Sequence, residues 1–110
     1  MTLVNAESAT EWPKATIELY VDHYGDIIAD YVNNGVNKRV TAPGAADWYD
    51  NSVTTIVADC GSLLTLTHTE NEDIWFYNMS SWELVSGNRS VKTYRVPSEP
   101  GEYYMSFDHS

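Results

Sequence analysis

Residues 12–32 read WPKATIELYVDHYGDIIADYV, and the spacing of the apolar residues in this stretch decides the predicted fold. Apolar and aromatic residues recur in it with the period of one face of an α-helix: Ile17, Tyr20, Val21, Tyr24, Ile27, Ile28, Tyr31 and Val32. Acidic residues follow one another by four and fall on the opposite side: Glu18, Asp22, Asp26 and Asp30. The pattern predicts an amphipathic helix over about residues 11–33, with one apolar and one acidic face.

Signals for the ends of a helix flank this stretch. Thr10 can act as the N-cap, and Pro13 then falls in the first turn, where its missing N–H costs nothing. The Asn33-Asn34-Gly35 sequence is typical of a helix C-cap. Gly25 lies inside the helix and costs about 1 kcal/mol relative to Ala, so the helix must be held by packing of its apolar face.

From Val53 onward the apolar period changes to two, which predicts β-strands joined by short turns. Short connections favour antiparallel neighbours. The predicted fold class is therefore α+β, with the N-terminal helix packed on an antiparallel meander of five or six strands. One domain covers residues 1–110, with a connection over 34–52 and a sheet over 53–107. The strands are expected at 53–58, 62–68, 74–79, 82–86, 91–96 and 102–107.

Both alternate sets of residues are apolar in the Ile74-Trp75-Phe76-Tyr77 strand. A single helix covers only one face of a sheet. We therefore expect either a curled sheet that is covered by residues 40–52 or a homodimer through the open sheet face.

The charge is the unusual bulk property of the chain, because 16 acidic residues against 6 basic ones give a net charge of −10. Such a surface repels nucleic acid and anionic lipid, and no apolar run is long enough to span a membrane. We expect a basic protein or nucleoprotein complex as partner, and no direct binding to nucleic acid or membrane. A single cysteine and the lack of a visible signal peptide predict a cytoplasmic protein.

The sequence offers little for catalysis or metal binding. Cys60 has only His68 as a candidate base in the β region, and no known nucleophile signature flanks it. His23, His68 and His109 are scattered, and the acidic run from Glu70 to Asp73 lacks the spacing of a calcium loop. We therefore expect no catalytic residues, no metal, no cofactor and no enzyme activity.

The acidic row of the helix is the most specific feature for function. Four helical residues rise about 6 Å, so its carboxylates recur at a spacing near that of phosphates along a nucleic-acid strand. The competing interpretation is that these acids are only the solvated face of the helix. The predicted partner-binding residues extend the row with acids and aromatics of the later loops: Glu18, Asp22, Asp26, Asp30, Asp47, Trp48, Tyr49, Asp50, Glu70, Glu72 and Asp73.

These features favour a small acidic inhibitor that blocks a nucleic-acid-binding protein or nuclease complex, with nucleic-acid mimicry as its mode of binding. In charge, size and lack of catalytic motifs, this role resembles that of the counter-defence proteins that disarm restriction or CRISPR effectors. One alternative is an immunity protein or antitoxin that masks a basic toxin. A second is a small-molecule-binding, cone-shaped α+β domain with a pocket between helix and sheet.

Overall fold

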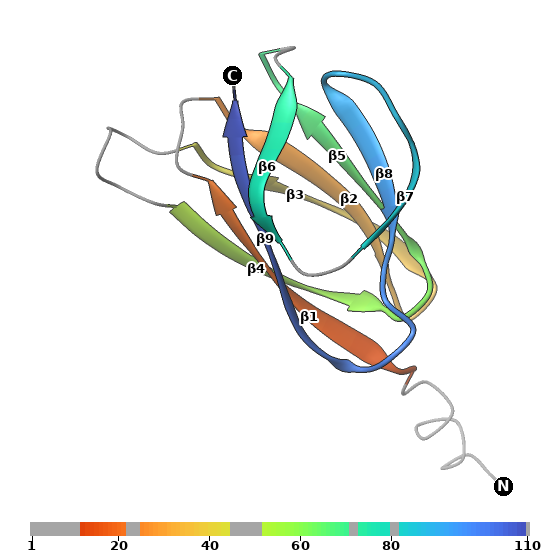
Figure 1. Ribbon diagram of the computed structural model, residues 1–110. Coiled ribbons are helices and arrows are strands. Elements are labelled where there is room, and N and C mark those ends of the chain that lie inside the picture. The colour runs from red at the N-terminus through yellow and green to blue at the C-terminus, as the bar shows by residue number, and fades with distance from the viewer. Residues whose placement is uncertain (1–11, 22–24, 45–51, 71–72, 80–81, 110) are drawn as a thin grey trace, which may run out of the picture.

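The computed structural model describes residues 12–21, 25–44, 52–70, 73–79 and 82–109, and these residues form nine β-strands and no helix (Figure 1). The strands are β1 (Lys14–Val21), β2 (Ile27–Asn33), β3 (Val36–Ala42), β4 (Ser52–Asp59), β5 (Leu63–His68), β6 (Ile74–Met79), β7 (Glu83–Gly87), β8 (Val91–Arg95) and β9 (Gly101–His109). Consequently, no helix in the described ranges could cross a lipid bilayer.

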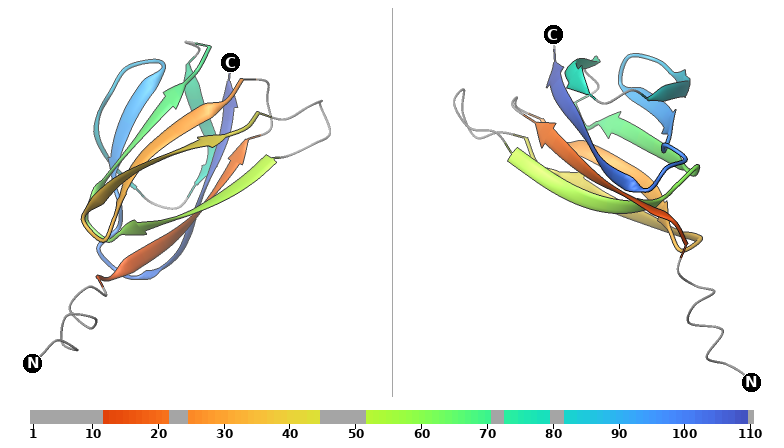
Figure 2. Two further views of the ribbon diagram at one scale, coloured as in Figure 1. Left: turned by 180° about the vertical axis from the view of Figure 1, so that it is seen from behind. Right: turned by 60° about the horizontal axis from the view of Figure 1, so that its bottom comes forward.

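The strands form two sheets that lie face to face as a β-sandwich (Figures 1 and 2). One sheet has the order β4-β1-β9-β6, and the other has the order β3-β2-β5-β8-β7. β1 pairs in parallel with β9 and antiparallel with β4, so the first and last strands of the fold are neighbours. The other described strand pairs are antiparallel.

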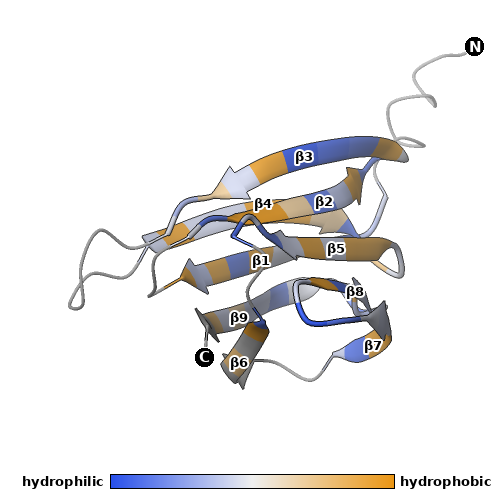
Figure 3. Cartoon of the chain, turned by 90° about the horizontal axis from the view of Figure 1, so that it is seen from above, coloured by the Kyte–Doolittle hydropathy of each residue, from blue (hydrophilic) through white to orange (hydrophobic). Residues whose placement is uncertain are grey.

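Alternating side chains of each sheet fill the space between the two layers. In β1, Ala15, Ile17 and Leu19 have no exposed surface, while the residues between them point away from the core. Leu64 and Leu66 of β5 enter the same core from the opposite sheet. Figure 3 shows the resulting change of hydropathy from residue to residue along the strands. This two-residue period is what a strand with one buried face requires.

Aromatic rings form the part of the core near β6 and β8. The Phe76 ring packs edge-on against Tyr94, with 5.4 Å between ring centroids, and lies tilted against Phe107, with 4.9 Å between centroids. Trp82 makes edge contacts with Tyr94 and with Tyr103. Such tilted and edge-to-face pairs add to the stabilisation that comes from burial alone. Together they tie β6, β8, β9 and the residue before β7 into one cluster.

The helix predicted over residues 11–33 is wrong, since the described part of this range forms β1 and β2. β1 has the sequence KATIELYV, in which polar and apolar residues alternate without a break. Leu19 is the residue that distinguishes this two-residue strand period from the helical period. A helix would place Leu19 among the acids, whereas in the structure it is fully buried. Gly25, with a φ of 91°, lies between the strands in a conformation that interrupts any helix. Thr10 lies outside the described residues.

The predicted helix C-cap at Asn33-Asn34-Gly35 is instead a hairpin turn. Asn33 pairs with Val36, so only Asn34 and Gly35 connect β2 to β3. Their φ values of 53° and 75° are both positive, as a two-residue turn that matches the twist of the strands requires. Asn-Gly is the preferred sequence for that turn, so the same dipeptide that resembles a cap specifies a hairpin here.

The α+β fold class and the strand meander are also wrong, although strands are found near all six ranges expected after residue 52. The structure is all-β in its described part. β4 pairs with β1, and β6 pairs with β9, so these neighbours are not the next strand along the chain. Local sequence indicates where a strand forms, but its partners are chosen by which apolar faces must be buried together.

Replacing Leu19 by Ala tests the strand assignment against the helix. We expect Leu19→Ala to lower the free energy of unfolding by about 2–5 kcal/mol, because it leaves a cavity in the core. The neighbouring Tyr20→Ala should cost about 1 kcal/mol, since Tyr20 lies on the outer face. Urea denaturation measures both values. The opposite ranking, with Tyr20 the costlier truncation, would contradict the strand.

Candidate functional site

The predicted row of carboxylates does not exist as a row. Glu18 lies on β1 and Asp30 on β2, and these strands belong to different sheets. Both side chains point away from the core, so they lie on opposite outer faces of the sandwich. Asp26 lies in the connection between the two strands, and Asp22 is outside the described residues. Spacing by four residues places groups on one face of a helix, but here the chain crosses between the sheets.

Asp30 is engaged within its own sheet. Its two carboxylate oxygens accept hydrogen bonds from Arg39 Nε at 2.7 Å and Arg39 Nη2 at 3.3 Å. The two residues are directly opposite in the β2–β3 register. This fork-like pair compensates the Asp30 charge, which makes Asp30 a poor candidate for attracting a basic partner.

Asp26 organises one end of the sandwich. Its Oδ1 accepts a hydrogen bond from Gly44 N at 2.9 Å, and its main-chain oxygen accepts one from Thr69 N at 3.0 Å. The connections that follow β1, β3 and β5 are thereby joined. Glu70, which is exposed, belongs to the same end, and its N–H donates to His68 Nδ1. Asp26 therefore has a structural role, since it holds three connections of the sandwich together.

The remaining predicted site residues are only partly described. Asp73 forms an ion pair with Lys92, with 3.6 Å between Oδ1 and Nζ. Besides Asp22, five residues of the predicted site lie outside the described part of the chain: Asp47, Trp48, Tyr49, Asp50 and Glu72. Of the predicted acids that the structure describes, Glu18 is the one whose surroundings suit a binding surface.

Glu18 lies in the middle of the outer face of β4, β1 and β9. In the register of these strands it is opposite Thr55 on one side and Tyr104 on the other. Glu102 is opposite Thr16, which makes Glu18 and Glu102 diagonal neighbours. Eight of the outward residues of the three strands are called the acidic face from here on: Thr16, Glu18, Tyr20, Val53, Thr55, Val57, Glu102 and Tyr104.

Apolar and aromatic groups surround the two carboxylates of the acidic face. Val53 is 49% exposed, and Val57 and Tyr104 are each 38% exposed. The Tyr20 hydroxyl donates a hydrogen bond of 2.9 Å to Glu18 Oε1. This bond and the nearby negative charge raise the pKa of Tyr20, so the phenol stays protonated. The face thus combines negative charge with large side chains that can be buried by a partner.

Of the six Lys and Arg residues, all of which lie in the described ranges, Lys14 is the one on a strand of the acidic face. Lys14, at the start of β1, is turned toward Asp59 and Asn34. The other five belong to the opposite sheet or to its loop before β8: Lys38, Arg39, Arg89, Lys92 and Arg95. Four of the six cations form ion pairs with Asp59, Asp30, Asp73 and Glu83 rather than with Glu18 or Glu102, and five of the six belong to the opposite sheet or its loop.

The outer face of the opposite sheet has a different character. Its described charges are largely paired, as in the contacts of Asp30 with Arg39 and of Glu83 with Arg95. Thr65 and Thr93 bond to each other across β5 and β8. A groove of about 490 Å³ lies on this face and is lined by Asp30, Tyr31, Val32, Asn37, Lys38, Leu63 and Thr65. This mixed surface carries no convergent set of reactive groups.

The groups considered for catalysis or metal binding do not assemble into a site in the described ranges. Burial and the neighbouring Asp59 raise the pKa of the Cys60 thiol, which is the opposite of what a nucleophilic cysteine needs. His68 is buried in the core and accepts the N–H of Glu70. A metal-binding group of three His, Cys, Asp or Glu is absent from the described residues. His23 and the His109 side chain are outside the description.

Glu102, Tyr104, Val53 and Val57 belong to the acidic face but were missed by sequence reasoning. The signal that could have found them is their alternation with buried residues, as in Tyr104 before Met105. That alternation shows that they point outward. It does not show that β9 and β4 lie beside β1, which depends on the whole fold.

Comparison of the chain with protein-family models, with curated proteins and with solved structures found no match.

The raised pKa of Cys60 leads to a test of its reactivity. At pH 7 we expect the folded protein to react with a thiol-specific disulfide reagent more slowly than the same chain unfolded in urea, because less of the thiol is ionised and it is partly buried. The rate in the folded state should keep rising at pH values where the unfolded chain has levelled off. A folded-state rate that exceeds the unfolded rate at pH 7 would instead indicate an activated cysteine.

Proposed function

We propose that this protein is a small binding protein that docks its acidic face on a basic surface of a nucleic-acid-binding protein or nuclease complex and thereby inhibits it. The observation that carries the proposal is the segregation of charge. Glu18 and Glu102 lie on a face whose strands carry one cation, Lys14, which is held by Asp59 and Asn34, and the other Lys and Arg residues belong to the opposite sheet or its loop. A net charge of −10 adds a long-range attraction toward a basic partner.

Charge and apolar area have separate tasks in this proposal. Opposite charge speeds the encounter and selects the partner, and its effect falls as salt rises because screening acts over about 10 Å at 0.1 M salt. Burial of Tyr104, Val53 and Val57 supplies short-range affinity. Because β-strands of a packed sandwich hold these side chains, little order has to be gained on binding.

Inhibition follows from competition for the same basic groups. A surface that binds phosphates presents Lys and Arg side chains, and carboxylates can occupy those groups in place of nucleic acid. The proposed competition does not depend on the helical spacing of carboxylates, which the fold rules out. It requires only that Glu18 and Glu102, as diagonal neighbours on parallel strands, approach the basic groups together.

Two further expectations belong to this proposal. A cytoplasmic location is proposed because the chain contains a single cysteine, Cys60. An immunity protein or antitoxin would use the same acidic face, and it differs only in having a toxin as its partner.

The cone-shaped α+β domain with a ligand between helix and sheet does not fit the structure, because the described part of the fold has no helix. The homodimer remains a prediction for sedimentation analysis.

Charge reversal on the acidic face tests the proposal. We expect Glu18→Lys/Glu102→Lys to weaken binding to the captured partner at least about tenfold, or roughly 1.4 kcal/mol, because two attractive contacts become repulsive. The partner is captured from cell lysate at low salt on immobilised protein and identified by mass spectrometry. Affinity is then measured with the purified partner at several salt concentrations, with and without competing nucleic acid.

The matched control is Asp30→Lys/Glu83→Lys on the opposite outer face, which has the same net charge as the test variant. Circular dichroism and thermal unfolding confirm that both variants are folded. We expect the control to retain most of the affinity. If both variants lose the same affinity, the net charge of the protein, and not the acidic face, determines binding. If the test variant loses no affinity, the acidic face has no role in binding. Displacement by nucleic acid distinguishes competitive inhibition from the masking of another surface.

A further inference from the structure

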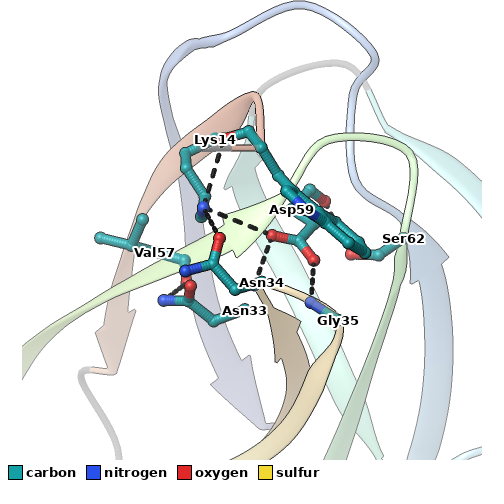
Figure 4. Close-up of polar contacts among 8 residues, drawn as sticks. Lys14, Asn33, Asn34, Gly35, Val57, Asp59 and Ser62 are labelled. Atoms are coloured by element: carbon teal, nitrogen blue, oxygen red, sulfur yellow. Dashed lines mark hydrogen bonds and ion pairs between the residues drawn. The ribbon is translucent and has the colours of Figure 1, made fainter. Parts of the chain in front are cut away.

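A compact cluster of charged and amide groups surrounds the β2–β3 turn, at the opposite end of the sandwich from Asp26 (Figure 4). Lys14 Nζ donates a hydrogen bond of 2.5 Å to Asn34 Oδ1 and lies 3.7 Å from Asp59 Oδ1. It also donates to the main-chain oxygen of Trp12 at 3.2 Å. The ammonium group of Lys14 is thus fixed against the side-chain carbonyl of Asn34 by three acceptors from separate parts of the chain.

Asp59, at the end of β4, holds the backbone of the same turn. Its Oδ1 accepts the N–H of Asn34 at 2.8 Å, and its Oδ2 accepts the N–H of Gly35 at 2.8 Å. Asp59 is only 3% exposed, whereas Asn34 is exposed to water. A buried carboxylate therefore lies on the Gly35 nitrogen, while a cation lies on the amide carbonyl of the residue before it.

We propose that Asn34 is a self-modification site, at which the folded turn promotes deamidation through attack of the Gly35 nitrogen on Asn34 Cγ. In any Asn-Gly sequence this attack closes a five-membered succinimide ring, and glycine permits it because no side chain hinders the nitrogen. The structure adds an acceptor for the proton that leaves, Asp59 Oδ2, and a cation for the charge that develops on the amide oxygen, Lys14 Nζ.

The proposed reaction balances with water as the only co-reactant. The Gly35 N–Cγ bond forms while Asp59 takes the proton from Gly35 N, and negative charge on Oδ1 is stabilised by Lys14. The Cγ–Nδ2 bond then breaks, and the nitrogen leaves as ammonia with the proton that Asp59 held. Water opens the succinimide at Cγ to give aspartate, or at the main-chain carbonyl carbon to give isoaspartate. No oxidant or reductant is consumed.

Lys14 acts as a donor in this scheme and is not the attacking group. Its amine would have to lose a proton before it could attack Asn34, whereas in the structure the group is held as a donor by Asn34 and Trp12 and lies beside the carboxylate of Asp59. The succinimide route thus uses Lys14 as a donor and Asp59 as an acceptor, which are the roles of these two groups in the structure. A direct amide bond between Lys14 and Asn34 is the rival outcome, and it can be recognised by peptide mapping.

Modification would change the turn, because aspartate at position 34 places a second carboxylate beside the buried Asp59, with Lys14 shared between them. Isoaspartate also inserts a methylene group into the backbone of a two-residue turn, where the register from Asn33 to Val36 leaves no spare residue. As deamidation accumulates with time, a growing fraction of molecules would therefore have a disturbed β2–β3 hairpin.

The decisive comparison is between the folded protein and the same chain unfolded in urea, at equal pH and temperature. Trypsin cuts after Lys14 and Lys38, so tandem mass spectrometry of peptide 15–38 locates the modified residue and distinguishes aspartate from isoaspartate by its fragments. We expect Asn34 to deamidate at least about tenfold faster in the folded chain, a modest share of what a positioned base or donor contributes. Asn33, in the same peptide but followed by Asn34, is the internal control.

Variants of Lys14 and Asp59 show whether these two groups accelerate the deamidation of Asn34 or whether the exposure of Asn34 to water alone sets its rate. Lys14→Met and Asp59→Asn should each bring the folded rate down to or below the unfolded rate, with thermal unfolding used to confirm that the variants are folded. A wild-type folded rate below the unfolded rate would overturn the proposal without reference to any variant. A tryptic peptide that stays uncut at Lys14, runs through Lys38 and has lost ammonia would overturn it in favour of the Lys14–Asn34 amide, because trypsin does not cut after an acylated lysine.

Discussion

The strict alternation of residues 14–21 is the constraint on which the rest of the structure depends. Because every second side chain of β1 is apolar and fully buried, this strand must lie inside a sheet and against another layer. Its neighbours are β4 on one side and β9, the last strand, on the other. The sheet can form only when the two ends of the described chain meet, so its stability is shared between distant segments.

The same alternation creates the surface proposed for binding. If Ile17 and Leu19 point inward, Glu18 must point outward, and the register then places it among residues of β4 and β9. Five of the six cations belong to the opposite sheet or its loop, and two of them, Arg39 and Arg95, form ion pairs with acids of that sheet. A sandwich keeps its two outer faces apart, and this separation leaves one face with Glu18, Glu102 and a single cation, Lys14, at the start of β1.

Much of the secondary structure could be predicted from sequence, but the topology and the site could not. The strands after residue 52 follow from their period and turns. A helical period also fits four apolar residues of the first two strands, Ile17, Val21, Ile28 and Val32. For this reason the helix predicted there is wrong. Leu19, which is buried, fits only a strand and is the residue that argues against the helix. Glu102 could not be joined to Glu18 because strand order depends on long-range burial, which no local pattern encodes.

The parallel pairing of β1 with β9 is the central claim of this account, and nuclear Overhauser effects between backbone protons test it most directly. The structure predicts cross-strand signals in the registers of Ile17 with Tyr103 and of Leu19 with Met105, as well as extended-chain signals along residues 14–21. Strong sequential amide–amide signals over residues 14–32, without any contact to residues 101–107, would show a helix and contradict the sandwich.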